Sequence, residues 1–280
     1  MEIEISPDLA EICGIHAGDG YLRDDGKRRE LDISGGIEEQ DYYNNHVVPL
    51  FERVFNIKIQ PRFFPHRNTY GFVIRDREVI KFMHSLGFPY GKKTLMVDVP
   101  EYVLSSRNLD IIYRFIRGVF DTDGCISFRK REGSGYSKVY LKRHTYPIIN
   151  LTTCSKNLWE GTCKLLMKTG FHPTVSYTKA KYNAHKKYRI FLRGDANIIN
   201  WINNIGFKNP IKLNRFVIWK KFGFMPPGLS YKDQIKILNG DIDPNDYYSD
   251  NLQMEENLLP LLVKRRLKVM KNLESFIPKD

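Results

Sequence analysis

Apolar residues recur at helical spacing in two segments of the chain that lie about a hundred positions apart. This three-and-four spacing is typical of amphipathic helices and predicts one helix in each segment. The residues that form the pattern are Leu9, Ile12 and Ile15 in the first segment, and Ile112, Phe115, Ile116 and Val119 in the second.

The two predicted helices also match residue by residue. Each has small residues four positions apart, which share one face and let two helix backbones approach closely. Each ends in Asp-Gly, and glycine is favoured just past a helix end. The matching residues all differ by 104 positions: Gly14 and Gly118, Gly18 and Thr122, Asp19 and Asp123, Gly20 and Gly124.

The two aspartates are placed where a helix disfavours them. The C-terminal end of a helix carries partial negative charge, which opposes an acid there by about 0.3–1 kcal/mol. If the helices lie side by side, Asp19 and Asp123 also raise each other's pKa. A divalent cation relieves both effects, and Mg²⁺ prefers carboxylate and carbonyl oxygens.

The rest of each half repeats one order of elements. An Asp-Gly turn at 24–27 between alternating segments predicts a hairpin, and Ser6-Pro7 predicts the start of the first helix. Further elements are expected at 41–55 (helix, with Pro49 inside it), 57–60 and 70–75 (strands) and 78–86 (helix), and then at 126–131 and 147–152 (strands), 157–169 (helix), 173–177 and 188–192 (strands) and 197–204 (helix).

This order predicts an α+β protein of two αββαββα repeats, related by a pseudo-twofold axis through the paired motif helices. We expect a first repeat at 1–107, a second at 108–222 and a helical extension at 223–280. Gly87-Phe88 and Gly206-Phe207 differ by 119 positions, so the second repeat carries about fifteen extra residues. We place most of them in the hairpin 129–147.

The predicted strands alternate apolar residues with basic and hydrogen-bonding ones. The formal net charge of +12 points toward a polyanionic partner, although charge alone is weak evidence. Arg and Lys read guanine edges, Gln reads adenine, and other basic groups hold phosphates. A solvated sheet face is the alternative. The candidate DNA contacts are Arg23, Lys58, Gln60, Arg62, Arg75, Ser127, Arg129, Arg131, Lys187 and Arg189.

The repeated nonapeptide resembles the signature of the LAGLIDADG homing endonucleases, in the form with both motifs in one chain. Asp19 and Asp123 match the family's last, metal-binding acid. The first acid of the motif is kept as Asp121 but is Ala17 in the first copy, and Arg117 replaces a small residue. The resemblance implies two four-stranded antiparallel saddles that form a DNA cradle, and a staggered, metal-dependent double-strand cut.

The expected chemistry is phosphodiester hydrolysis with Mg²⁺ or another divalent cation such as Mn²⁺. Asp19 and Asp123 are the expected ligands, with the carbonyls of Gly18 and Thr122 as weaker candidates. The resemblance also implies a basic residue near each scissile phosphate. Matched spacing after Gly87 and Gly206 selects Lys93 and Lys212, with Lys92 and Lys208 as rivals and an exposed loop lysine as the alternative.

Other features narrow the class of protein. The four cysteines form no zinc-ligand spacing, and His16 is expected to be a packed residue rather than a ligand. Without a signal-peptide pattern or an apolar run of the roughly 18–20 residues that a membrane helix needs, we expect a soluble, intracellular protein. The resemblance to the two-motif form implies a monomer. The compartment would be cytoplasmic in a prokaryote, and otherwise organellar or nuclear.

The tail beyond residue 222 is expected to contain a helix at 231–238, an acidic loop at 241–250 and a basic amphipathic helix at 260–276. Packing against the second repeat is its expected role, and a secondary DNA contact is the alternative. Because the chain starts with Met1 and lacks a terminal His-Asn pair, we expect a free-standing or intron-encoded protein rather than an intein.

Two functions follow. The first is site-specific cleavage of double-stranded DNA. The second is DNA binding without cleavage, as a regulator, or help in splicing intron RNA, because basic sheets bind both polymers. Both acids, Asp19 and Asp123, are retained, which favours cleavage.

Overall fold

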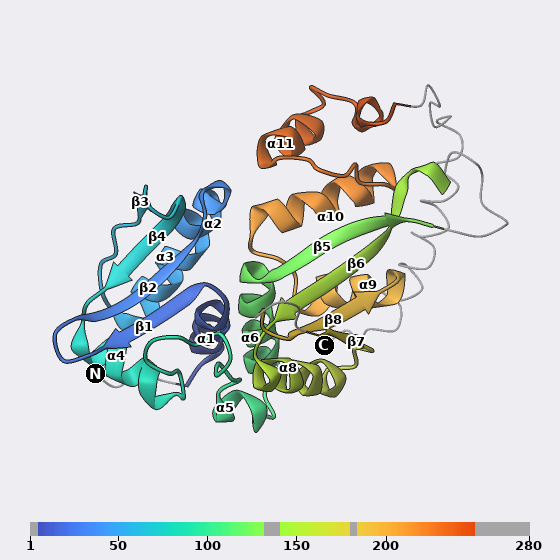
Figure 1. Cartoon of the computed structure of the whole chain (residues 1–280). Coiled ribbons are helices and arrows are strands. Elements are labelled where there is room, and N and C mark those ends of the chain that lie inside the picture. The colour runs from blue at the N-terminus through green and yellow to red at the C-terminus, as the bar shows by residue number, and fades with distance from the viewer. Residues whose placement is uncertain (1–4, 132–140, 180–183, 250–280) are drawn as a thin grey trace, which may run out of the picture.

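The computed structural model describes residues 5–131, 141–179 and 184–249. It contains two similar halves that meet through helices α1 (Pro7–Asp19) and α6 (Leu109–Thr122). Figure 1 shows this helix pair in the middle of the molecule with one antiparallel sheet on each side. The predicted α+β fold of two repeats around paired motif helices is confirmed.

The first half forms as the hydrophobic pattern predicts. The side chain of Ser6 accepts a hydrogen bond from Leu9 N–H at 3.2 Å and so fixes the start of α1. The sheet has the order β1-β2-β4-β3. Its elements are β1 (Gly20–Asp24), β2 (Arg29–Gly36), β3 (Arg62–Phe64) and β4 (Thr69–Ile74), followed by α4 (Arg77–Ser85) and α5 (Glu101–Leu104).

The single helix expected at 41–55 is divided. A 3-10 turn, η1 (Ile37–Glu39), leads into α2 (Gln40–Tyr42), a π-helical turn, η2 (Tyr43–Val47), and α3 (Val48–Phe55). Val48 N–H donates to Tyr43 O across five residues, and the next residue, Pro49, has no N–H to give. Proline is tolerated in the first turn of a helix, which is where Pro49 lies in α3.

The strand expected at 57–60 is wrong, because β3 starts only at Arg62. Asn56 ends α3 in the left-handed conformation with φ of 50°. Ile59 N–H then donates to the Glu52 carboxylate at 2.8 Å instead of to a neighbouring strand, and Pro61 has no N–H for a ladder. Lys58 and Gln60 are still exposed, as the alternation predicted.

The second half repeats the order of elements. Its sheet is β5-β6-β8-β7. Gly20 pairs with Ile33 and Gly124 with Leu151, so the offset between the repeats grows from 104 to 118 across the β5–β6 hairpin, where we expected the insertion. The elements are β5 (Gly124–Lys130), β6 (His144–Thr153), α8 (Lys156–Lys168), β7 (Thr174–Thr178), β8 (Lys187–Arg193) and α9 (Asp195–Asn204).

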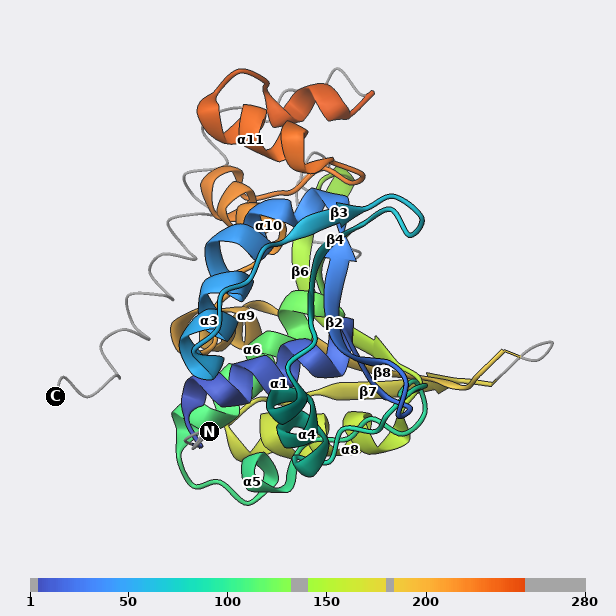
Figure 2. The same ribbon diagram turned by 90° about the vertical axis from the view of Figure 1, so that its left-hand side faces the viewer.

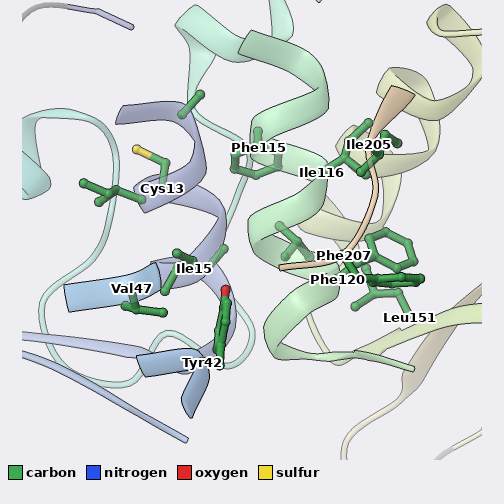
Figure 3. Close-up of a cluster of buried hydrophobic side chains, with 14 of the residues drawn as sticks. Cys13, Ile15, Tyr42, Val47, Phe115, Ile116, Phe120, Leu151, Ile205 and Phe207 are labelled. Carbon is green, nitrogen blue, oxygen red and sulfur yellow. The ribbon is translucent and has the colours of Figure 1, made fainter. Parts of the chain in front are cut away.

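One hydrophobic core runs through both halves. Figure 2 shows the two sheets toward one side of the molecule and helices α3 and α9 toward the other. Figure 3 shows Ile15 on α1, and Ile116 and Phe120 directed from α6 toward Ile205 and Phe207. All five side chains are at most 6% exposed, so the helix pair is the centre of the core rather than a surface joint.

A helix that the sequence reading did not predict, α10 (Pro210–Phe222), follows the second sheet. It packs against α11 (Tyr231–Asn239), which confirms the helix expected at 231–238. Tyr231 Oη donates to Asp41 Oδ2 at 2.9 Å, so the extension also reaches the first half. A short 3-10 turn, η3 (Pro244–Tyr247), comes next. The helix expected at 260–276 lies outside the described residues, and the boundaries at 107 and 222 stay predictions.

Candidate metal centre and DNA-facing surface

Glycines set the separation of the two motif helices. A Cβ atom placed on Gly14 would lie 2.9 Å from Val119 N, and one on Gly118 would lie 2.7 Å from Ile15 N. Real Cβ atoms do not approach backbone this closely, so α1 and α6 can pack backbone against backbone only because both positions lack a side chain. Gly18 likewise abuts Thr122 and lies against Asp123. The close approach therefore brings the two motif acids together.

Arg117, the departure from the motif, lies at the edge of this helix pair and is compatible with it. Its guanidinium donates to the Glu11 carboxylate of α1 at 2.8 and 2.6 Å. Arg114 pairs with the same carboxylate at 2.7 Å, as does His46. Burial alone would raise the pKa of Glu11, but the bonds from His46 and Arg117 hold it below its ordinary value. An ion network around Glu11 thus joins α1 and α6.

The two motif acids lie in different surroundings. Asp19 is half-buried and accepts a hydrogen bond from Tyr43 Oη at 2.8 Å. Loss of solvent around it raises its pKa to about 7, and the charges of Glu39 and Asp123 add to the rise. Asp123 keeps an exposed side chain. Its pKa is also raised by the loss of surrounding water, while Lys93 and Lys212 oppose the rise.

The predicted lysines cap the motif helices. Lys93 Nζ donates to the carbonyls of His16, Ala17 (2.8 Å) and Gly18 (2.5 Å). Lys212, in α10, donates to the carbonyls of Phe120, Asp121 and Thr122 at 2.7, 2.6 and 2.9 Å. Burial lowers the pKa of both amines, that of Lys93 to about 8. The sequence reading did not include this structural role; a part for either lysine in the chemistry stays a prediction.

The rival lysines differ from this pair. Lys92 and Lys208 both have exposed side chains. Lys208 contributes through its backbone, because its N–H donates to Asp121 Oδ2 at 2.8 Å. Asp121 is fully buried, so the first acid of the second motif supports the segment that leads into α10 and does not face solvent.

The residues present suit a hard divalent cation. Asp19 and Asp123 supply two carboxylates, and loss of solvent raises the pKa of each. The carbonyls of Gly18 and Thr122 already accept bonds from the lysines, which leaves each oxygen one lone pair. In the described ranges no group of three His, Cys, Asp or Glu side chains has an arrangement that could hold a metal, so the remaining ligands of a bound cation would be oxygens of water or of a phosphate.

Three residues of the site were not predicted. A Cβ on Gly35 would lie 2.5 Å from Glu39 Oε2, 2.8 Å from Asp19 Oδ2 and 3.0 Å from Tyr43 Oη. These oxygens therefore gather around Gly35. Asn209, which is fully buried, donates to Glu39 Oε1 at 2.6 Å. No motif spacing marks Glu39, Tyr43 or Asn209, because only the tertiary fold brings them to the acid.

The strand register places six candidate DNA contacts on the solvent faces of the sheets. In the first sheet the buried pair Leu22 and Leu31 faces the core. In the second sheet the buried pairs Ile126 with Ile149 and Leu151 with Ile190 do so. Because successive strand residues point to opposite faces, the solvent faces carry Arg23, Arg62, Ser127, Arg129, Lys187 and Arg189.

The other four candidates lie next to these strands. Gln60, Arg62 and Arg75 line one shallow pocket with Pro61 and Val73, and Lys58 is exposed just before it. Arg131 follows β5, with its guanidinium 4.8 Å from the centre of the Tyr146 ring. Arg23 already pairs with Asp25. The structure thus places the candidates on the solvent faces of the sheets or next to their strands. Their contact with DNA stays a prediction.

Among the residues that the structure describes, no helix is long and apolar enough to cross a bilayer.

His16 is fully buried, as expected, with its ring centre 4.4 Å from that of Phe88. The cysteines Cys13, Cys125, Cys154 and Cys163 are free thiols.

Residues 110–206 match the family described as a LAGLIDADG-like domain. This range holds the second motif helix and its sheet, and the first repeat has the same architecture and the matching motif copy. The second repeat therefore matches the LAGLIDADG-like domain, and the chain as a whole has two repeats of this architecture, each with its own copy of the motif helix.

Two curated proteins and one solved structure are similar to this chain. The replication factor C small subunit of Methanocaldococcus jannaschii is 26% identical over 217 residues, which are 77% of this chain and 10% of that protein. The tRNA-splicing ligase RtcB of the same organism is 24% identical over 222 residues, 71% of this chain and 22% of that protein. The chain thus spans about a tenth and about a fifth of the lengths of these relatives. The solved structure of I-DmoI in complex with DNA and Mn is 17% identical, with a TM-score of 0.49, and the match covers 72% of this chain and 98% of that one.

Proposed function

We propose that the protein is a site-specific endonuclease that makes a staggered cut in double-stranded DNA with a divalent cation, Mg²⁺ or Mn²⁺. One observation carries the proposal: two acids with raised pKa values, Asp19 and Asp123, lie at the ends of packed helices between two sheets with basic solvent faces. A protein that only bound DNA would gain nothing from acids that repel phosphate at this point.

The charge distribution supports DNA as the partner. The sheet faces offer arginine, lysine and glutamine side chains at alternating positions, and these can reach base edges and phosphates in the major groove. The net charge of +12 favours association with a polyanion. The two sheets flank helices α1 and α6 (Figure 1), which end at Asp19 and at the cap residue Asp123, so a duplex that lay along both sheets would pass close to these helix ends.

The residues of the site divide the work of hydrolysis. When bound, a divalent cation supplies charge neutralisation at phosphorus and activation of a water. Asp19 and Asp123 would hold cations in the two halves of the site through their carboxylates, one acid for each strand. Lys93 and Lys212 fix the helix ends that carry these acids. Their positive charge also favours the ionised form of Asp123.

The test is a cleavage assay on a randomised duplex library with Mg²⁺. It compares the native chain with Asp19→Asn and Asp123→Asn, which remove the charge but keep the side-chain shape. We expect double-strand cuts at one long site, lost in either variant while binding survives. Tight binding without cleavage under any divalent ion would overturn the proposal in favour of a regulator or an intron-RNA splicing helper.

A further inference from the structure

The two acids occupy equivalent positions in the repeats, but among the described residues only Asp19 accepts a hydrogen bond from a side chain. Tyr43 Oη donates to Asp19 Oδ2 at 2.8 Å, which sets the orientation of the carboxylate. Glu39 lies on the same side, around Gly35. No side chain in the described part of the structure hydrogen-bonds the Asp123 carboxylate, which is exposed.

Glu39 is itself held from both repeats. Gly36 N–H donates to its Oε2 at 2.9 Å, and Asn209 Nδ2 donates to its Oε1 at 2.6 Å. The other hydrogen of the same amide is used on Asp121 O at 2.9 Å. Because Asn209 is fully buried, the Glu39 carboxylate is anchored to the end of α6 as well as to its own chain segment.

The second repeat has no counterpart to this arrangement. The sheet registers equate Ile33 with Leu151, so the positions that correspond to Glu39 and Tyr43 are Asn157 and Gly161. Asn157 is exposed on α8. Gly161 has no side chain and packs against Val99, where a Cβ would lie 2.6 Å from Val99 Cγ2. At these two described positions the Asp123 side therefore has neither the hydroxyl nor the extra carboxylate.

We propose that Tyr43 and Glu39 are positioning residues that make the two halves of the site unequal, so that the strand served by Asp19 is cut first. This inference rests on the proposed nuclease function. Tyr43 keeps one Asp19 oxygen in place, which lowers the ordering needed when a cation binds. The negative charge of Glu39 beside it attracts the cation. The Asp19 side therefore fills at a lower metal concentration than the Asp123 side.

The first measurement is Mn²⁺ binding by electron paramagnetic resonance, without DNA cleavage. Asp123→Asn isolates the Asp19 side, and the comparison adds Glu39→Gln or Tyr43→Phe to it. Removing a residue that orients a ligand commonly weakens metal binding 10–100-fold, so we expect a loss of roughly tenfold. Asn157→Gln, at the counterpart position, is the matched control and should leave binding unchanged. Equal Mn²⁺ affinity with and without Glu39 and Tyr43 would overturn the proposal.

The second measurement resolves the strands. A duplex with the recovered target site, labelled on each strand in turn, is cut at limiting Mg²⁺. We expect a nicked intermediate with one preferred strand in the native chain and in Asn157→Gln, and nearly equal strand rates in Glu39→Gln and Tyr43→Phe. A strand preference that survives in both variants would refute the positioning role. No cleavage by the native chain would instead refute the nuclease function, and the Mn²⁺ comparison would still decide the role of Glu39.

Discussion

Replacing Lys212 with methionine tests whether the buried lysines hold the ends of the motif helices. Methionine keeps most of the length of the side chain but has no donor. In the native chain Lys212 is 7% exposed, and its amine contacts three carbonyls at the end of α6. Those carbonyls are among the four that a helix leaves without internal partners, so Lys212→Met should loosen the helix end that carries Asp123.

The size of the effect follows from the three bonds. Each contributes a net amount of about 1 kcal/mol, and a cation at a helix C-terminus adds about 0.3–1 kcal/mol. Removing a buried charge returns part of this, because its desolvation no longer opposes folding. We therefore expect the free energy of unfolding to fall by about 2–3 kcal/mol. Lys93→Met should behave similarly on α1.

Urea unfolding of the metal-free protein, followed by circular dichroism, measures this change without any contribution from catalysis. Lys208→Met is the matched control: its side chain is exposed, and its backbone bond to Asp121 survives the substitution. The control should stay within about 0.5 kcal/mol of the native chain. If Lys212→Met unfolds at the native urea midpoint, Lys212 is not a helix cap, and any loss of cleavage must come from the chemistry.

Two further predictions concern the helix pair. Gly14→Ala should lower the free energy of unfolding in urea by about 2 kcal/mol, because overpacking outweighs the gain in helix propensity. Gly36→Ala is the control and should leave the free energy of unfolding unchanged, because its added Cβ meets nothing within 3.6 Å and its φ is −62°. A native-like Gly14→Ala would show that α1 and α6 do not pack this closely. Glu11→Gln should lower the free energy of unfolding by about 3–5 kcal/mol near neutral pH, because it leaves Arg117 without its charged partner. The pKa of Glu11 is lowered on folding, so its stabilisation is present above the ordinary value of 4.5 and is lost as the pH falls below it. Thermal unfolding between pH 3 and 7 checks this, and a pH-independent gap between the two proteins would contradict it.

The repeat was predictable because its signals are local. Helical spacing, Asp-Gly ends and turn glycines each depend on residues within one or two turns. Matching copies 104 positions apart then fixed the pairing of α1 with α6 without knowledge of the contacts. The resemblance to the family implied a basic residue near each scissile phosphate, and the matched spacing after each Gly-Phe pair then selected Lys93 and Lys212.

The residues that complete the site could not be predicted in this way. Tyr43 reaches Asp19 only because a π-turn precedes Pro49, and a regular helix was the natural expectation for that segment. The misplaced strand at 57–60 has a similar cause: Glu52, seven residues away from Ile59, takes the backbone N–H that a strand would have used. In both places a specific side chain or a proline overrides a pattern that is otherwise clear.

Helix α10 links these observations. Asn209 caps its start and donates to Glu39 of the first repeat, while Lys212, three residues further on, holds the end of α6 in the second. One helical turn therefore contacts Glu39, which lies beside Asp19, and the end of α6, which carries Asp123. The sequence pattern did not predict this helix, and its two contacts had no visible connection in the sequence. Because the same turn supports Asp121 O and Glu39, a shift of α10 would alter both halves of the site together, whereas Tyr43 acts on Asp19 alone. The two halves of the site thus differ in their contacts but share α10 as a support. The difference between them can therefore be measured within a single folded protein.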